Sequence, residues 1–124
     1  MSFRAALGLA AVGLMAGTLT PVWAHHAHGN YEQTYIDMEG TVTEVHMIVP
    51  HPWIYIEVVR DGQKRLWGLE GGGRRDQSIK VGDTIKVRCH PLRDGNTICL
   101  LGFLKAADGS VQDWDGKEPP PKDF

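Results

Sequence analysis

The sequence predicts an all-β protein: a small five- to six-stranded OB-like barrel preceded by a signal peptide. Its hydrophobic runs are short, rich in β-branched and aromatic residues, and separated by tight turns, and no run has a helical period. The first run contains Gly40, a residue type that lets a small sheet bend and close on itself. A longer connection joins the third and fourth runs, as an OB-like barrel would require. A small β-sandwich is the alternative architecture.

Residues 1–24 have the features of a secretory signal peptide. Arg4 supplies the positive charge, and residues 5–19 form an apolar stretch that is short for a bilayer span. Val22 and Ala24 stand at the two positions that a signal peptidase reads. We therefore expect cleavage after Ala24 and a periplasmic or secreted protein with no stable membrane insertion. A retained membrane anchor is the alternative.

Cleavage would leave 100 of the 124 residues, enough for one domain with a modest core. This mature chain would carry 12 basic and 15 acidic residues, a net charge of −3 with neutral histidines. Nucleic-acid-binding domains are typically basic, so no nucleic-acid partner is expected. The expected organisation is a signal peptide over 1–24, a His-rich segment over 25–34, a β-barrel domain over 35–114 and a Pro-rich disordered tail over 115–124.

Six segments have the alternation of strands: 35–49, 53–60, 63–69, 84–90, 97–104 and a short 110–114. Asp61-Gly62 between the second and third segments is a strong hairpin signal. Residues 70–78 have no apolar period and include the sequence Gly71-Gly72-Gly73-Arg74-Arg75, which predicts a mobile surface loop. A phosphate-binding loop is disfavoured there because no Gly-Lys-Ser/Thr follows.

Cys89 and Cys99 flank the turn around Asp94. In an oxidising compartment two such cysteines are expected to form a disulfide, which a hairpin with an odd-numbered loop would allow by placing them opposite each other. A thiolate metal site is the alternative. Their spacing is not Cys-x-x-Cys, which disfavours a thiol oxidoreductase.

Six short motifs along the chain resemble those of a family of small exported bacterial proteins of unknown function. The motifs stand here as His25-His26, Gly40-Thr41-Val42, Pro50-His51-Pro52-Trp53, Trp67-Gly68-Leu69-Glu70, Val81-Gly82-Asp83 and Pro91-Leu92-Arg93-Asp94-Gly95, and they cover about 25–109. The resemblance implies an exported β-barrel and no particular activity. Val49 replaces the family's Asn, and Ala27-His28-Gly29 replaces its Ser-Phe, which adds a histidine.

Histidines are the residues with the clearest potential for chemistry. Cleavage after Ala24 would give His25 a free α-amino group, which could chelate a metal together with its imidazole. Nitrogen donors of this kind favour Cu(II), with Ni(II) or Zn(II) as alternatives. His51, fixed between two prolines, is the candidate to complete the site with His26 and His28, while His46 and His90 are reserves. Alternatively, the His-rich end binds metals only adventitiously and His51 is structural.

Three aromatic residues, Trp53, Tyr55 and Trp67, could form a binding face of the kind that OB-like barrels use. Alternatively, they point into the core. Glu57 and Glu70 lie near them and are explained by surface solvation. Because no nucleophile motif is present, we do not expect an enzyme. The sequence thus favours a metal-binding barrel, or else a non-catalytic module that engages a protein or an envelope polymer.

Overall fold

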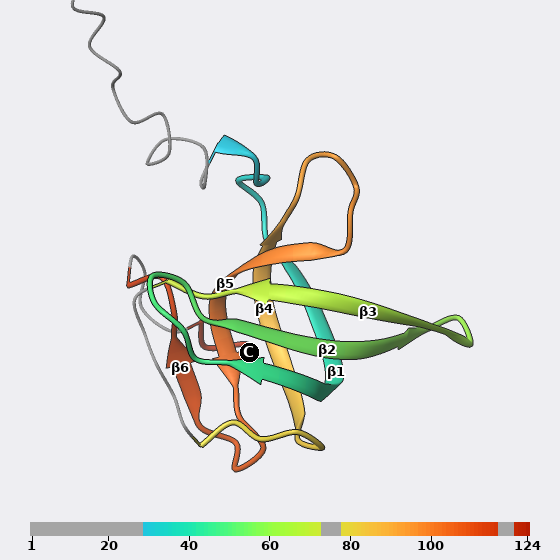
Figure 1. Cartoon of the computed structure of the whole chain (residues 1–124), viewed down its shortest axis with the longest axis vertical. Helices are drawn as coiled ribbons and strands as arrows, with labels where there is room; N and C mark the ends of the chain where they lie inside the picture. The colour runs from blue at the N-terminus through green and yellow to red at the C-terminus, as the bar shows by residue number, and fades with distance from the viewer. Residues whose placement is uncertain (1–28, 73–77, 117–120) are drawn as a thin grey trace, which may run out of the picture.

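The computed structural model describes residues 29–72, 78–116 and 121–124. They contain six β-strands, shown in Figure 1: β1 (Ile36–His46), β2 (Trp53–Arg60), β3 (Gln63–Glu70), β4 (Thr84–Pro91), β5 (Ile98–Lys105) and β6 (Val111–Asp113). The strand bounds predicted from the alternation of apolar and polar residues agree with the observed bounds to within a few residues for all six strands. The alternation is informative because each strand has one face on the core. The largest difference is in β1, which ends at His46, so that Ile48 and Val49 are exposed in the loop to β2.

The six strands form one sheet in the order β3-β2-β1-β4-β5-β6. Neighbours along this order are antiparallel, and β3 also pairs with β5 in parallel through Gly68, Leu69 and Glu70. This last pairing closes β1 to β5 into a barrel, and β6 is added beyond β5. The predicted small OB-like barrel is therefore confirmed, and the sandwich alternative is excluded.

The long strand β1 pairs with a different strand along each half of its length. Its first half pairs with β4 and its second half with β2, and Thr41 pairs with both. A Cβ at Gly40 would lie 2.7 Å from the carbonyl oxygen of Glu57, so the close approach of β2 there requires glycine. A bulge follows at Thr43, which has no partner in the register between Val42 and Glu44. Gly40 therefore marks the close approach of β1 and β2, and the bulge in β1 lies three residues later.

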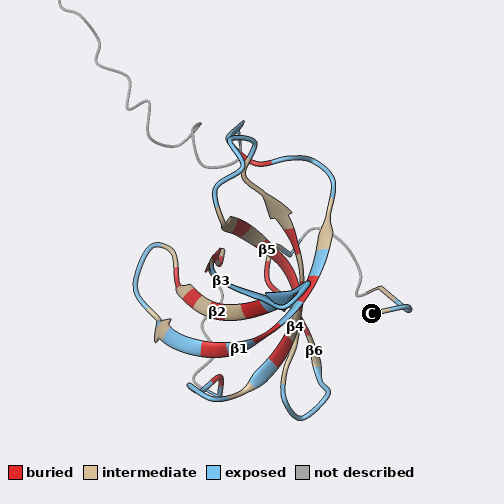
Figure 2. Cartoon of the chain, turned by 90° about the vertical axis from the view of Figure 1, so that its right-hand side faces the viewer, coloured by how far each residue is buried: buried red, intermediate tan, exposed pale blue. Residues whose placement is uncertain are grey.

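The second strand shows the alternation most clearly. Ile54, Ile56 and Val58 are buried, whereas Trp53 and Tyr55 between them are only half-buried on the outer face. The turn to β3 has positive φ at both Asp61 (52°) and Gly62 (75°), as the predicted two-residue hairpin requires. Burial along the strands appears as alternating colours in Figure 2.

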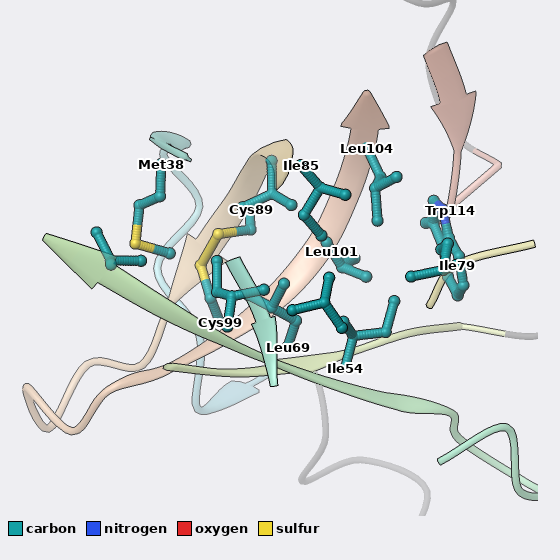
Figure 3. Close-up of a cluster of buried hydrophobic side chains, with 14 residues drawn as sticks. Met38, Ile54, Leu69, Ile79, Ile85, Cys89, Cys99, Leu101, Leu104 and Trp114 are labelled. Carbon is teal, nitrogen blue, oxygen red and sulfur yellow. A yellow bond between two sulfur atoms is a disulfide. The ribbon is translucent and has the colours of Figure 1, made fainter. Parts of the chain in front are cut away.

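Fourteen of the buried side chains form one hydrophobic cluster inside the barrel, shown in Figure 3. Its members come from every long strand and from the segments around them: Met38, Val42, Ile54, Ile56, Val58, Leu69, Ile79, Ile85, Val87, Cys89, Cys99, Leu101, Leu104 and Trp114. Trp114, just after β6, covers one end of this cluster and is 2% exposed.

Cys89 and Cys99 form a disulfide between β4 and β5, inside the core. The sequence suggested that the two cysteines lie directly opposite each other. In the structure they do not, since Cys89 pairs with Leu101 and Cys99 pairs with Pro91. They are therefore offset by two residues, which keeps both sulfurs on the same face of the sheet. The register shifts at Gly102, which lies unpaired between Leu101 and Phe103.

Both ends of the chain extend beyond the described strands. The predicted signal peptide and its cleavage site lie outside the described residues. The tail predicted to be disordered over 115–124 is described only at 115–116 and 121–124. Its last residues contact β4, where Arg88 donates to Asp123 at 3.3 Å and lies over the Phe124 ring. In the described part of the chain no helix is long and apolar enough to cross a membrane.

Candidate functional site

His51 lies at the mouth of β2, in the turn where the sequence places a histidine between two prolines. Pro52 is fully buried, and its carbonyl oxygen accepts a hydrogen bond from the Gly71 amide at 2.8 Å. Gly71 is itself packed closely, since a Cβ there would lie 2.7 Å from Pro52 and 2.8 Å from Trp114. The turn before β2 is thereby held against the residue that follows β3.

The imidazole of His51 is oriented by this packing. Its Nδ1 lies 3.2 Å from the carbonyl oxygen of Gly71. A carbonyl oxygen can only accept, so Nδ1 must carry the proton. In the neutral ring Nε2 then has a free lone pair, the arrangement in which histidine binds a metal while its other nitrogen donates to a carbonyl. The side chain is 44% exposed, so a ligand can reach it from solvent.

A carboxylate accompanies His51. Glu70, the last residue of β3, has Oε1 3.9 Å from Nδ1 of His51 and is 12% exposed. Its other oxygen accepts a short hydrogen bond from the hydroxyl of Tyr31. Burial raises the pKa of the Tyr31 phenol, and the hydrogen bond to Glu70 raises it further. The interpretation of Glu70 as a solvated surface residue was therefore wrong, and Glu57 alone is exposed and paired, with Lys64 at 3.5 Å.

Tyr31 is fixed from the other side by the β4–β5 turn. It forms a β-bridge with Leu92, and its carbonyl oxygen accepts from Nε of Arg93 at 3.1 Å. The neighbouring Glu32 amide donates to Pro91 at 2.8 Å. The later part of the predicted His-rich segment is thus anchored on the barrel, and Tyr31 contacts the same Glu70 that lies near His51. Sequence reasoning missed both Tyr31 and Glu70, because the contact between them spans 39 residues.

The other predicted metal ligands are separate from this cluster or outside the described chain. His25, His26 and His28 lie outside the described residues. His46 contacts Glu44 at 2.5 Å on the outer face, and His90 stacks on Tyr35 with ring centroids 4.0 Å apart. Among the described residues no three His, Cys, Asp or Glu side chains group as a metal site. The cysteines are joined to each other, which leaves the thiolate alternative without free ligands.

The three aromatic residues do not share one face. Trp53 and Tyr55 lie together on the outer face of β2, their rings within 19° of parallel and 6.2 Å apart. Both rings lie over Gly68 of β3, where a Cβ would come within 3.3 Å of Tyr55 and 3.5 Å of Trp53. Trp67 pairs with Ile56 and therefore points to the inner side of the hairpin. The predicted face thus consists of Trp53 and Tyr55 without Trp67, and neither alternative held for all three residues.

These observations define a small closed β-barrel with a His–Glu–Tyr cluster at the mouth of β2. A protein-family model described as a family of unknown function (DUF6152) matches residues 13–101, and the chain belongs to this family. The match agrees with the resemblance seen in the motifs. No curated protein matches the chain, and no solved structure matches it.

Proposed function

We propose that this protein is an exported binding protein that takes up a transition metal, Cu(II) in the first place, through His25, His26, His28 and His51. The observation that carries the proposal is the contact chain from Tyr31 through Glu70 to His51. Tyr31 follows His28 by three residues in the sequence, and Tyr31 shares Glu70 with His51, whose Nε2 is free for a metal.

The residues suit the chemistry of copper. An N-terminal His25 would offer an α-amino nitrogen and an imidazole, and His51 would offer Nε2. The Gly71 carbonyl oxygen, which accepts from Nδ1, would make the His51 imidazole a better donor, as acceptors behind metal-binding histidines do. Ni(II) and Zn(II) accept the same donors and are the alternative ions. The proposal contains no catalytic step.

Titration of Cu(II) into the mature chain tests this function. The sample is the protein beginning at His25, with its terminus confirmed by mass spectrometry, and binding is followed by calorimetry. We expect one tight site, weakened at least about tenfold by one added alanine before His25 and by His51→Ala. His46→Ala is the matched control, since His46 lies on the outer face, and it should change the affinity less than about twofold. Equal, weak binding in all four proteins would refute the proposal.

A second function is favoured by one specific observation, the outward pair of Trp53 and Tyr55. Near-parallel aromatic rings on an exposed sheet face are suited to stacking on an envelope polymer, and OB-like barrels use the β2–β3 face in this way. In this alternative the protein is a non-catalytic interaction module and the histidines are incidental.

Co-sedimentation with insoluble peptidoglycan tests this alternative. Binding should be lost in Trp53→Ala and kept in Leu66→Ala, because Leu66 is an exposed residue further along the same face. A protein that stays in the supernatant at all loads, or one for which both variants sediment alike, would remove this function.

A further inference from the structure

A second concave site lies on the β2–β3 hairpin, away from His51. It has a volume of about 250 Å³ and is lined by Val58, Arg60, Asp61, Gln63, Arg65 and Trp67. None of these residues belongs to the proposed metal site or to the outer pair of Trp53 and Tyr55.

The hollow exists because the hairpin is longer than the barrel. Ile56 pairs with Trp67, Val58 with Arg65, and Arg60 with Gln63, so these residues share the face that is turned to the core. Ile56 is fully buried, but Arg60 and Arg65 on the same face are exposed. Figure 1 shows the hairpin running past the other strands. Its inner face thus changes from apolar to cationic where the barrel ends.

Two guanidinium groups in this hollow are not neutralised by carboxylates of the described chain. Arg60 donates to the backbone carbonyl of Asp37 at 3.0 Å. This hydrogen bond orients the side chain but does not neutralise its charge, because a carbonyl is uncharged. Arg65 has no ion pair within the described residues. Asp61 lines the hollow too, so its lining carries one net positive charge. Because the whole chain has a net charge of −2, this positive site stands out.

The part of the hollow nearer the barrel is apolar. Trp67 is partly buried and packs against the core, and Val58 is 3% exposed. An indole and an aliphatic side chain beside two guanidinium groups can contact the flat body of a ligand while the arginines bind its anionic group. The volume is below that of pockets for drug-sized molecules, which limits the ligand to a small one.

We infer that this hollow binds a small organic anion in which a carboxylate or phosphate is attached to a planar apolar group. Arg65 and Arg60 bind the oxyanion, and Trp67 with Val58 contacts the planar body. The site is independent of the proposed metal site, because it shares no residue with it.

Two-dimensional NMR titration of the mature protein tests this inference. The probes are 1-naphthoate and 1-naphthyl phosphate as anions, with 1-naphthalenemethanol as the uncharged analogue. We expect saturable shifts of the Trp67 indole and of hairpin amides with at least one anion, and binding of the alcohol at least about tenfold weaker. The anion that binds tighter identifies the preferred group.

Two substitutions on the same hairpin sharpen the test. Arg65→Gln should weaken anion binding at least about tenfold, while Lys64→Gln should change it less than about twofold, since Lys64 is on the other face and paired with Glu57. Both positions are exposed, so neither change threatens folding. Absence of saturable shifts, equal binding of the alcohol, or equal effects of the two substitutions would overturn the inference.

Discussion

At the scale of single residues, Arg88 organises the outer side of β4. Its Nε and one terminal nitrogen donate to the two carboxylate oxygens of Asp37 at 2.7 and 2.9 Å. The hydrogen bond from Arg88 lowers the pKa of Asp37 below its ordinary value, and burial opposes this only in part. A lowered folded-state pKa means that the pair stabilises the protein above the unfolded pKa of about 3.9, and that this stabilisation is lost as the pH falls further.

Asp37→Asn should therefore lower the free energy of unfolding at pH 7 by about 0.5–1 kcal/mol, a modest value because Asp37 is more than a third exposed. As the pH is lowered from 7 to about 2, the difference between the wild type and the variant should shrink, since Asp37 becomes progressively protonated. Urea denaturation at both pH values measures the difference. Glu39→Gln, an exposed neighbour on β1, is the control. A difference that persists at low pH would show that the carboxylate is not the cause.

At the scale of elements, β1 depends on the missing side chain of Gly40. Gly40→Ala would place a Cβ 2.7 Å from the backbone of β2, which cannot move without breaking its own ladder. We expect a loss of about 1–3 kcal/mol in the free energy of unfolding, measured by thermal or urea denaturation. The control is Gly29→Ala, because a Cβ at Gly29 meets nothing within 4 Å. Equal stability of the two variants would contradict the conclusion that the close approach of β2 requires glycine at position 40.

The strands and their turns were the features that could be predicted best from the sequence. Alternation in β2 and the Asp61-Gly62 turn defined the second strand and its hairpin, since both are local signals. The positions of the bulges, at Thr43 and at Gly102, depend on the register with a partner strand, which the sequence of one strand does not contain. The same reason explains why Trp67 does not share a face with Trp53 and Tyr55, since its side of the hairpin follows from its pairing with Ile56.

At the scale of the whole molecule, the disulfide joins β4 and β5 within the core of a small barrel. Replacing both Cys89 and Cys99 by alanine should lower the free energy of unfolding by about 2–4 kcal/mol, because the unfolded chain gains freedom and the core loses two buried sulfurs. Urea denaturation of the double variant measures this change. A loss well below 1 kcal/mol would mean that the β4–β5 pairing needs no cross-link.

Only part of the candidate site could be predicted from the sequence, because the site depends on closure of the whole barrel. His51 could be found from its two prolines, which are adjacent in sequence. Glu70 and Tyr31 could not, since their contacts join the end of β3, the turn before β2 and the segment before β1. Closure of the barrel brings these three places together, and no local pattern encodes it.

Locating bound Cu(II) on the mature protein by NMR tests the proposed metal site at His51 most directly. Cu(II) is paramagnetic, so one equivalent broadens the amide signals of residues near it. If Cu(II) binds at the proposed site, the signals of His51, Gly71 and Tyr31 should disappear, while those of the β2–β3 turn at Gly62 should remain. Broadening that leaves His51 and Tyr31 untouched, or that centres on His46 or His90, would contradict it.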